Sequence, residues 1–464
     1  MPNNTDRIFI KYSNLLLKMD KPKVVLINPP SPWLLSDREQ PPLGLLDIAS
    51  YLRANNVDVT FCDLAGFPEK YWWIPDGDIY GITCATPHYN LVIQIVKKIK
   101  DRQPNSVVVV GGFHPTVEPE RTLRDTKADI AMVGEGEQAM LDIVNGKREK
   151  IIRGALVEDI NKIPMPAFDM VDMYDYVKMG TNLVIGSTPN NKEAKLMEAR
   201  GCPFDCAFCA QAAISKRRMR YKTVERVVEE IKHVHYRYGV DRIYFINDTF
   251  IVDDKRVVKL CAALKELKNQ GILHDWHCLT RADRTDPELF RIMHESGCRM
   301  LTYGIESGSQ KILDVIEKQT TVEENMNAIK IAKAAGLKVR AQMIVGLPGE
   351  TEETVEETAN FIREAPADSY GMHIFVPLPG CQIWNDPDKF DFPINKETTF
   401  DYYHTIGKRE EEDAAYLHQN PKQIIEWKNY LVKVIGERNI VKYAEVRADT
   451  EKLKTAVTSS GYIQ

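Results

Sequence analysis

The sequence contains no long apolar run and no marked excess of either charge. None of its segments approaches the roughly 18 consecutive apolar residues that a membrane span requires. Residues 1–20 mix polar and apolar side chains, unlike a signal peptide. The 61 basic and 66 acidic residues leave a net charge of −5, which argues against binding to nucleic acid. We therefore expect a cytoplasmic protein that binds neither membranes nor nucleic acid.

Cysteine is too sparse for a disulfide framework. The 464 residues include nine cysteines, whereas domains held by disulfides are short and rich in cysteine. Three of the nine fall within residues 202–209, a cluster that indicates a metal site in a reducing compartment. The others lie mostly in or beside apolar runs, and we expect them to be buried as small hydrophobic side chains. They are Cys62, Cys84, Cys261, Cys278, Cys298 and Cys381.

The first third of the chain alternates short apolar segments with helical patterns. The apolar segments are continuous and rich in β-branched residues, as in parallel strands that are buried on both faces. They are residues 24–27, 57–62, 79–84, 107–110 and 130–133. Between them, residues 45–55 and 91–100 have the spacing of amphipathic helices. The alternation predicts a doubly wound α/β domain with a parallel sheet over residues 22–145, after an extension of residues 1–21.

A second alternation of strands and helices follows. Its expected strands are residues 195–199, 242–246, 276–279, 300–304, 339–345 and 372–376. Six βα units predict a partial barrel, here residues 183–394, because the closed form has eight. Residues 146–182 lack periodicity, contain Pro164 and Pro166, and are interpreted as a linker. Residues 395–464 are expected to form a helical C-terminal domain, in which no motif is evident.

The cysteine cluster follows the first expected barrel strand. Cys202, Cys206 and Cys209 have C-x3-C-x2-C spacing and lie in a βα loop, on the face of the barrel where catalysis takes place. A cubane cluster normally takes four thiolates, so three leave one iron open for a substrate or cofactor. Zinc is the alternative metal, but structural zinc sites use a second pair of Cys or His, and the sequence has none nearby.

The triplet resembles the cluster motif of the radical SAM superfamily, and the resemblance covers residues 194–380. It implies that SAM chelates the open iron and is cleaved by one electron to methionine and a 5′-deoxyadenosyl radical. An external electron donor such as ferredoxin or flavodoxin is then required. Further matches follow three expected strands, where barrel ligands bind. They are residues 245–250, 303–308 and 344–350.

The resemblance also assigns roles to single residues. Phe208 matches an aromatic position whose backbone contacts adenine, and Glu306 and Ser307 match a position that contacts the ribose or the methionine of SAM. Asn247 and Asp248 stand where many members have Gly-Gly-Glu, and this departure leaves open which residue binds the methionine amino group. A loop carboxylate in a salt bridge is the structural alternative for Glu306.

A basic run, residues 216–222, follows the cluster motif. We interpret it as a loop that covers an anionic ligand or as a solvated charge run before a helix. A patch that binds nucleic acid is the weakest of the three interpretations.

The N-terminal domain lacks two well-known motifs. No G-x-G-x-x-G opens its first helix, which excludes the usual nicotinamide site. No D-x-H-x-x-G follows its first strand, so the histidine that binds cobalt in proteins with that motif is missing. Ligands of doubly wound domains bind beyond the carboxyl ends of the strands. The loops there supply our candidate residues, namely Asn28, Pro30, Thr83, Thr86, His88, Gly111, Gly112, His114, Thr116, Gly134, Glu135 and Gly136.

These loops resemble the cobalamin-binding domain of class B radical SAM enzymes over residues 22–145. The motifs that carry the resemblance are residues 41–45, Gly111–Gly112, His114 and residues 134–137. The resemblance implies a bound cobalamin; a degenerate domain without a corrinoid is the alternative. His88 is our candidate for the residue beneath cobalt, followed by Tyr89. Alternatively, His88 caps the next helix or contacts the corrin edge.

Together the two resemblances imply a cobalamin-dependent C-methyltransferase. In that chemistry methylcobalamin donates a methyl group to an unactivated substrate carbon from which the 5′-deoxyadenosyl radical has removed hydrogen. A cyclase or rearrangement enzyme without methyl transfer has the same motifs, and a non-catalytic corrinoid or cluster sensor is the non-enzymatic alternative. The chain is also similar to the peptidyl glutamine C-methyltransferases of methanogens, which implies a peptide or protein substrate. Small metabolites and lipids remain open.

Overall fold

The computed structural model describes residues 22–32, 34, 36–180, 192–397, 400 and 420–438. The expected N-terminal extension, residues 1–21, and much of the expected C-terminal domain lie outside these residues. In the described part of the chain, no helix has both the length and the apolar character needed to cross a membrane.

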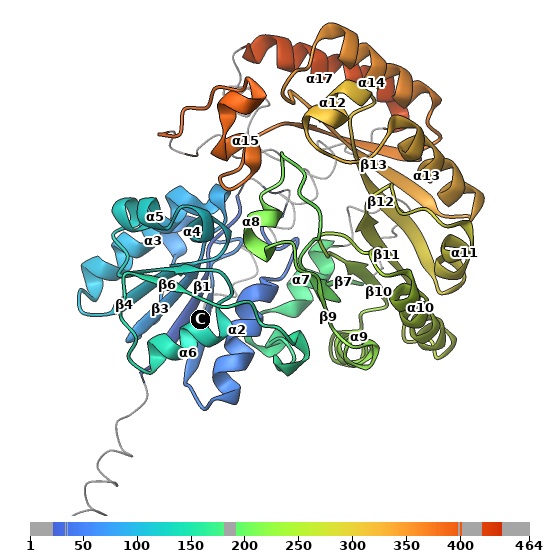
Figure 1. The fold of residues 1–464 in the computed structure, drawn as a ribbon. Coiled ribbons are helices and arrows are strands. Elements are labelled where there is room, and N and C mark those ends of the chain that lie inside the picture. The colour runs from blue at the N-terminus through green and yellow to red at the C-terminus, as the bar shows by residue number, and fades with distance from the viewer. Residues whose placement is uncertain are drawn as a thin grey trace, which may run out of the picture.

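The N-terminal domain is a six-stranded parallel sheet in the order β2-β1-β3-β4-β5-β6. Its strands are β1 (Val24–Asn28), β2 (Val59–Asp63), β3 (Ile79–Thr83), β4 (Val107–Gly111), β5 (Ile130–Val133) and β6 (Ile151–Arg153). Helices α2 (Leu43–Ala54) and α6 (Glu137–Val144) pack together on one face, and α3 (Tyr89–Arg102) and α5 (Pro119–Thr126) on the other (Figure 1). This confirms the expected doubly wound fold. The strand order reverses between β1 and β3, the neighbours where such folds open a crevice.

The apolar strands explain this sheet. The first four residues of β1, Val24 to Ile27, are completely buried, because helices cover both faces of the sheet. The segment expected to be a linker contains β6, the short 3-10 helices η3 (Ile160–Lys162) and η4 (Phe168–Met170), and α7 (Met173–Gly180). The sheet therefore has one strand more than we predicted. β6 has only three residues, of which only Ile152 is buried, too few to give a periodic signal.

The second domain is an open barrel of six parallel strands in the order β14-β13-β12-β11-β10-β7. Its strands are β7 (Glu193–Leu196), β10 (Arg242–Phe245), β11 (Asp275–Thr280), β12 (Cys298–Glu306), β13 (Lys338–Val345) and β14 (Ser369–Ile374). The helices that connect them are α9 (Val224–Tyr238), α10 (Asp254–Asn269), α11 (Pro287–Glu295), α12 (Gln310–Val315), α13 (Val322–Ala334) and α14 (Glu352–Glu364). All six expected strands are present.

Local sequence sets the helix limits in the barrel. The side chain of Thr223 accepts a hydrogen bond from the backbone of Arg226 at the start of α9, and Gly239 ends that helix with φ 71°. The apolar stripe of α9, formed by Val227, Ile231, Val234 and Tyr238, is buried in the core. At the start of α13, Thr321 and Glu324 form a capping box.

Three further segments complete the described structure. The two-residue strands β8 (Ala199–Arg200) and β9 (Arg220–Tyr221) pair antiparallel and enclose the cysteine loop and α8 (Gln211–Ser215). Helix α15 (Gln382–Asn385) and the short 3-10 helix η6 (Pro387–Phe390) follow the last barrel strand. Helix α17 (Pro421–Ile435) packs against α14 and β14 on the outside of the barrel (Figure 1).

Candidate active site

The carboxyl ends of the two sheets face each other. Arg200, at the end of β8, donates hydrogen bonds of 2.7 Å to Glu137 and of 2.7 Å to Asp47 of the N-terminal domain. On the other side of the junction, Trp384 Nε1 donates to Glu118 at 3.1 Å. The loops that follow the strands of one domain are therefore in contact with the loops that hold the cysteine motif of the other.

Glu135 continues this junction. Its carboxylate accepts hydrogen bonds of 2.7 and 2.8 Å from Arg220 and lies 3.3 Å from a nitrogen of Arg200. Although burial alone would raise its pKa, Arg220 and Arg200 hold the pKa of Glu135 below its ordinary value. The basic run of residues 216–222, for which we considered a loop over an anionic ligand or a solvated charge run, thus contributes Arg220 to a carboxylate of the protein. Arg218 likewise pairs with Glu158.

The three clustered cysteines lie on one short loop between β8 and α8. Cys209 N–H donates to the carbonyl of Cys206 at 3.0 Å, so these two form a single turn. Burial raises the pKa of Cys209 to about 12 and also raises the pKa of Cys202. In the described part of the chain no group of three or more His, Cys, Asp or Glu side chains is close enough to hold a metal ion. The three thiols therefore lie on one loop, but in this structure they do not form a metal-binding group.

Glu306 lies at the end of β12 in a left-handed backbone conformation, with φ 66°. Its carboxylate accepts a hydrogen bond of 2.7 Å from Lys318, and both side chains are buried. The Lys318 ammonium also lies 5.5 Å from the ring centre of Phe208. The salt bridge that we considered for Glu306 is therefore present, beside the expected adenine position. Sequence reasoning missed Lys318, since no local pattern links it to Glu306.

The other expected SAM residues differ in how accessible they are. Ser307 is completely buried and bonds to Thr358 at 3.2 Å. Asn247 is buried and accepts from the backbone N–H of Glu198 at 3.0 Å. Asp248 is exposed, and it accepts a hydrogen bond of 2.7 Å from Gln211, two residues after Cys209. Of these three, Asp248 is the one that a ligand near the cysteine loop can reach.

Several expected cobalamin residues meet at the ends of β3, β4 and β5. Gly112 has φ 104°, and a Cβ there would lie 3.1 Å from Thr83 Oγ1 and from Cys84 backbone atoms. Thr116 donates to the carbonyl of Gly112 at 2.7 Å and accepts from Gly134 N–H at 3.0 Å. Gly111 accepts at 2.7 Å from Cys84 N–H. This edge of the N-terminal sheet therefore consists of backbone atoms and small side chains.

His114 and Thr86 are buried beneath the same edge. Thr86 Oγ1 and His114 Nδ1 are 3.1 Å apart, and the imidazole packs against Tyr89 and Phe400. Burial lowers the pKa of His114 to about 3, so the ring is neutral at ordinary pH. Nε2 has no hydrogen-bond partner among the described residues.

The loop after β1 contacts the loop after β3. Asn28 donates to Asp63 at 2.9 Å, and Pro30 is buried. His88 Nδ1 accepts from Ala85 N–H at 3.2 Å, and its Nε2 lies 2.9 Å from Ser31 Oγ. Because Nδ1 accepts, Nε2 carries the proton in the neutral ring. The bond to Ala85 closes the short 3-10 helix η2 (Thr86–His88), and the His88 side chain makes no capping hydrogen bond to α3, unlike our capping alternative. A role beneath cobalt or at the corrin edge stays a prediction.

The remaining glycines of the expected cobalamin site pack against protein. A Cβ on Gly134 would lie 2.6 Å from the Gly154 carbonyl, and one on Gly136 would lie 2.5 Å from Ile48. These close approaches give both glycines a role in the fold, whatever they contribute to a ligand.

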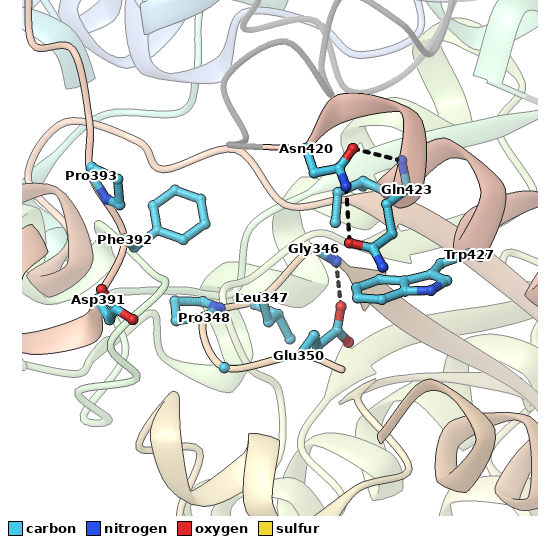
Figure 2. Close-up of a pocket in the computed structure, with 12 residues that line it drawn as sticks. Gly346, Leu347, Pro348, Glu350, Asp391, Phe392, Pro393, Asn420, Gln423 and Trp427 are labelled. Atoms are coloured by element: carbon cyan, nitrogen blue, oxygen red, sulfur yellow. Dashed lines mark hydrogen bonds between the residues drawn. The ribbon is translucent and has the colours of Figure 1, made fainter. Parts of the chain in front are cut away.

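A pocket of about 190 Å³ opens where the loop after β13 meets α17. Figure 2 shows Glu350 beside Trp427 at one end and Phe392 at the other. Glu350 accepts from Gly346 N–H at 2.5 Å, and burial raises its pKa to about 8. The pocket thus includes residues 346–350 of the expected motif, and sequence reasoning missed the contribution of α17.

The chain matches two family models. Residues 199–362 match the Radical SAM superfamily, and residues 36–144 match the B12 binding domain. An uncharacterized methyltransferase of Pyrococcus horikoshii is 32% identical over 78% of this chain and 82% of its own length. The chain belongs to the cobalamin-dependent radical SAM family. Because this relative is named as a methyltransferase, the comparison supports assignment of the chain to the radical SAM methyltransferases.

Two further similarities extend this result. The anaerobic magnesium-protoporphyrin IX monomethyl ester cyclase of Rubrivivax gelatinosus is 28% identical, over 78% of this chain and 71% of its own. The radical SAM methyltransferase TsrM of Kitasatospora setae, solved with cobalamin and a [4Fe–4S] cluster, aligns with a TM-score of 0.63. It is 15% identical, and the alignment covers 79% of this chain and 77% of TsrM. That likeness confirms the fold of both domains.

Membership of the cobalamin-dependent radical SAM family fixes three cofactors: a [4Fe–4S] cluster, SAM and cobalamin. It also requires an electron donor. The residues present fit these groups. Three thiols on one loop are a suitable donor set for an iron–sulfur cluster. On the opposite edge, His114 has a buried nitrogen that is unsatisfied among the described residues.

Proposed function

We propose that this protein methylates an unactivated carbon of its substrate. The observation that supports the proposal is the junction described above, where the carboxyl ends of the cobalamin-binding domain and of the radical SAM barrel face each other. A substrate between these edges is within reach of both cofactors. Cobalamin supplies the methyl group, and SAM with the reduced cluster supplies the radical that activates the carbon.

The protein's own residues hold and orient these groups. We assign Cys202, Cys206 and Cys209 to the cluster, and Asp248 and Glu306 to SAM, with Phe208 at the adenine. Lys318 fixes the carboxylate of Glu306, and its burial keeps water from that pair. The remaining residues are assigned to the corrin, namely Asn28, Pro30, Thr83, Thr86, His88, Gly111, Gly112, His114, Thr116, Gly134, Glu135 and Gly136.

The substrate class that we propose is a peptide or protein side chain, with ferredoxin or flavodoxin as the electron donor and a cytoplasmic location. The substrate class rests only on the resemblance to peptidyl glutamine C-methyltransferases stated in the sequence analysis. Each of these three assignments stays a prediction.

A cyclase is the second candidate function, because the relative from Rubrivivax gelatinosus is a cyclase that is 28% identical. The two functions share every residue that we assign to a cofactor. They differ in their products, since only the methyltransferase adds a carbon atom to the substrate.

Anaerobic incubation with reductant and SAM that carries a trideuterated methyl group separates the functions. Methyl transfer predicts a substrate that gains one labelled methyl group, together with 5′-deoxyadenosine, both detected by mass spectrometry. A cyclase would give 5′-deoxyadenosine with no labelled substrate, and a sensor would give neither. Omission of the reductant is the control, and it should abolish both products.

A further inference from the structure

Arg281 lies one residue beyond β11, next to the cysteine loop. Its side chain is 7% exposed. Nη1 donates a hydrogen bond of 3.2 Å to the sulfur of Cys206. The two residues are 75 positions apart in the sequence, so only the fold brings this guanidinium to a cysteine of the motif.

The guanidinium is held in place from several sides. Asp283 accepts hydrogen bonds from Nε at 3.0 Å and from Nη2 at 3.1 Å, and the Lys318 carbonyl accepts from Nη2 at 2.6 Å. The ring of Phe204, two residues before Cys206, lies 3.8 Å from the guanidinium carbon. Because these contacts already fix the planar guanidinium of Arg281, it loses little conformational freedom when it also binds sulfur.

We propose that Arg281 is a positioning residue of the iron–sulfur cluster that raises its reduction potential through a charge-assisted hydrogen bond to Cys206. Reduction adds one negative charge to the cluster, and a nearby buried cation stabilises that charge. Hydrogen bonds to cluster sulfurs and local net charge are established determinants of the potential. The proposal depends on Cys206 as a cluster ligand and applies equally to a methyltransferase and a cyclase.

Asp283 does not cancel this effect. Its side chain is 17% exposed, whereas that of Arg281 is 7% exposed, so water screens the carboxylate more than the guanidinium. The nitrogen that contacts sulfur is Nη1, while Asp283 contacts Nε and Nη2. The positive charge therefore lies between the cysteine loop and the carboxylate.

The same arginine connects the cysteine loop to the proposed SAM site. Its partner Lys318 accepts through the backbone carbonyl and uses its ammonium to bind Glu306. One buried array thus runs from Cys206 through Arg281 and Lys318 to Glu306. Movement of Arg281 would disturb the cluster and the expected SAM carboxylate together.

The test uses the full chain, reconstituted anaerobically with iron and sulfide. Redox titration followed by electron paramagnetic resonance measures the midpoint potential of the wild type, Arg281→Met and the control Arg284→Met. Arg284 is exposed on the same loop, so the control removes an equal but solvated charge. We expect a more negative potential in Arg281→Met and no change in Arg284→Met. Equal potentials in loaded Arg281→Met and wild type would overturn the proposal.

A second measurement keeps the test decisive if Arg281→Met assembles no cluster. Wild-type protein labelled with ¹⁵N in its arginine guanidinium groups is reduced and examined by pulsed electron paramagnetic resonance. We expect a ¹⁵N coupling to the cluster, which should vanish in Arg281→Lys. Absence of the coupling in the wild type, or its persistence in Arg281→Lys, would contradict a bond from Arg281.

Discussion

The carboxyl edges of the two sheets, which face each other in this protein, consist of different kinds of residues. The barrel edge consists of charged and sulfur-bearing side chains, among them the Cys202–Cys209 loop, Arg281 and the Lys318–Glu306 pair. The opposing edge consists of glycines, threonine hydroxyls and backbone hydrogen bonds around Gly112, with the neutral His114 beneath. Two parallel sheets of different strand order thus meet: one ends in a charged edge, and the other ends around Gly112 in uncharged groups, with the carboxylates of Glu135 and Glu137 paired to arginines beside them.

The difference follows from what each edge holds. A cluster and SAM both carry charge, and buried charges need partners of opposite sign placed within a few ångströms. A flat macrocycle needs space and close access to the backbone, which glycine provides. Substitutions at the barrel edge should therefore act through lost charge or ligands, and those at the opposing edge through lost space.

The largest effect is expected at the barrel edge. Replacement of Cys202, Cys206 and Cys209 together by Ala should reduce iron from about four per chain, the content of one cubane cluster, to none. Iron and sulfide analysis after anaerobic reconstitution measures this. Cys278→Ala is the matched control, since Cys278 is completely buried away from the loop and should leave the iron content intact. Iron that persists in the triple variant would refute the cluster assignment.

Substitutions at the opposing edge should reduce cobalamin binding by steric conflict. Gly112→Trp should abolish bound cobalamin, read from corrin absorbance, because a side chain there would meet Thr83 and Cys84 at 3.1 Å from its Cβ and displace the strand-end loops that are expected to hold the corrin. Gly146→Trp is the control: Gly146 has a similar φ of 107°, but no neighbour lies within 4 Å of its Cβ position. Equal cobalamin content in both variants would show that Gly112 does not line the site.

Glu306→Ala should show that charge matters at the barrel edge. Loss of one charge-assisted hydrogen bond costs about 1.5–3 kcal/mol, or roughly a 10- to 150-fold weaker affinity for SAM. Isothermal titration with the loaded protein measures the Kd, and the cluster spectrum should stay unchanged. The double variant Glu306→Ala with Lys318→Ala removes the unpaired lysine as well. If neither variant changes the Kd, Glu306 serves only its salt bridge.

The smallest effect, taken per pH unit, concerns a charge introduced at His114, beneath the opposing edge. His114 has an ordinary pKa of 6.5, lowered to about 3 by burial, so the unfolded chain binds the proton first as the pH falls. Stability should therefore decrease from pH 6.5 towards pH 3, by at most about 1.4 kcal/mol per pH unit. Thermal unfolding of the wild type and His114→Gln measures this. Identical pH dependence of Tm in both would contradict a neutral buried His114.

Sequence patterns predicted the architecture because its signals are local. Continuous β-branched strands such as Val24–Ile27 and the C-x3-C-x2-C spacing each lie within a few residues. What escaped prediction depends on distant partners: Arg281 meets Cys206 across 75 positions, and Arg220 meets Glu135 across 85. Nothing in the motif around Glu135 indicates that its carboxylate pairs with Arg220. The short strand β6 escaped because three residues cannot show a period.

The arginines at the junction also limit how this protein can be rebuilt by recombination. Arg200 and Glu137 have side chains that are only 14% and 3% exposed, and each depends on the other domain for its partner. Exchange of either domain for one from a distant homologue would leave a desolvated charge without its counterion. The two domains must therefore be inherited, or engineered, as a matched pair.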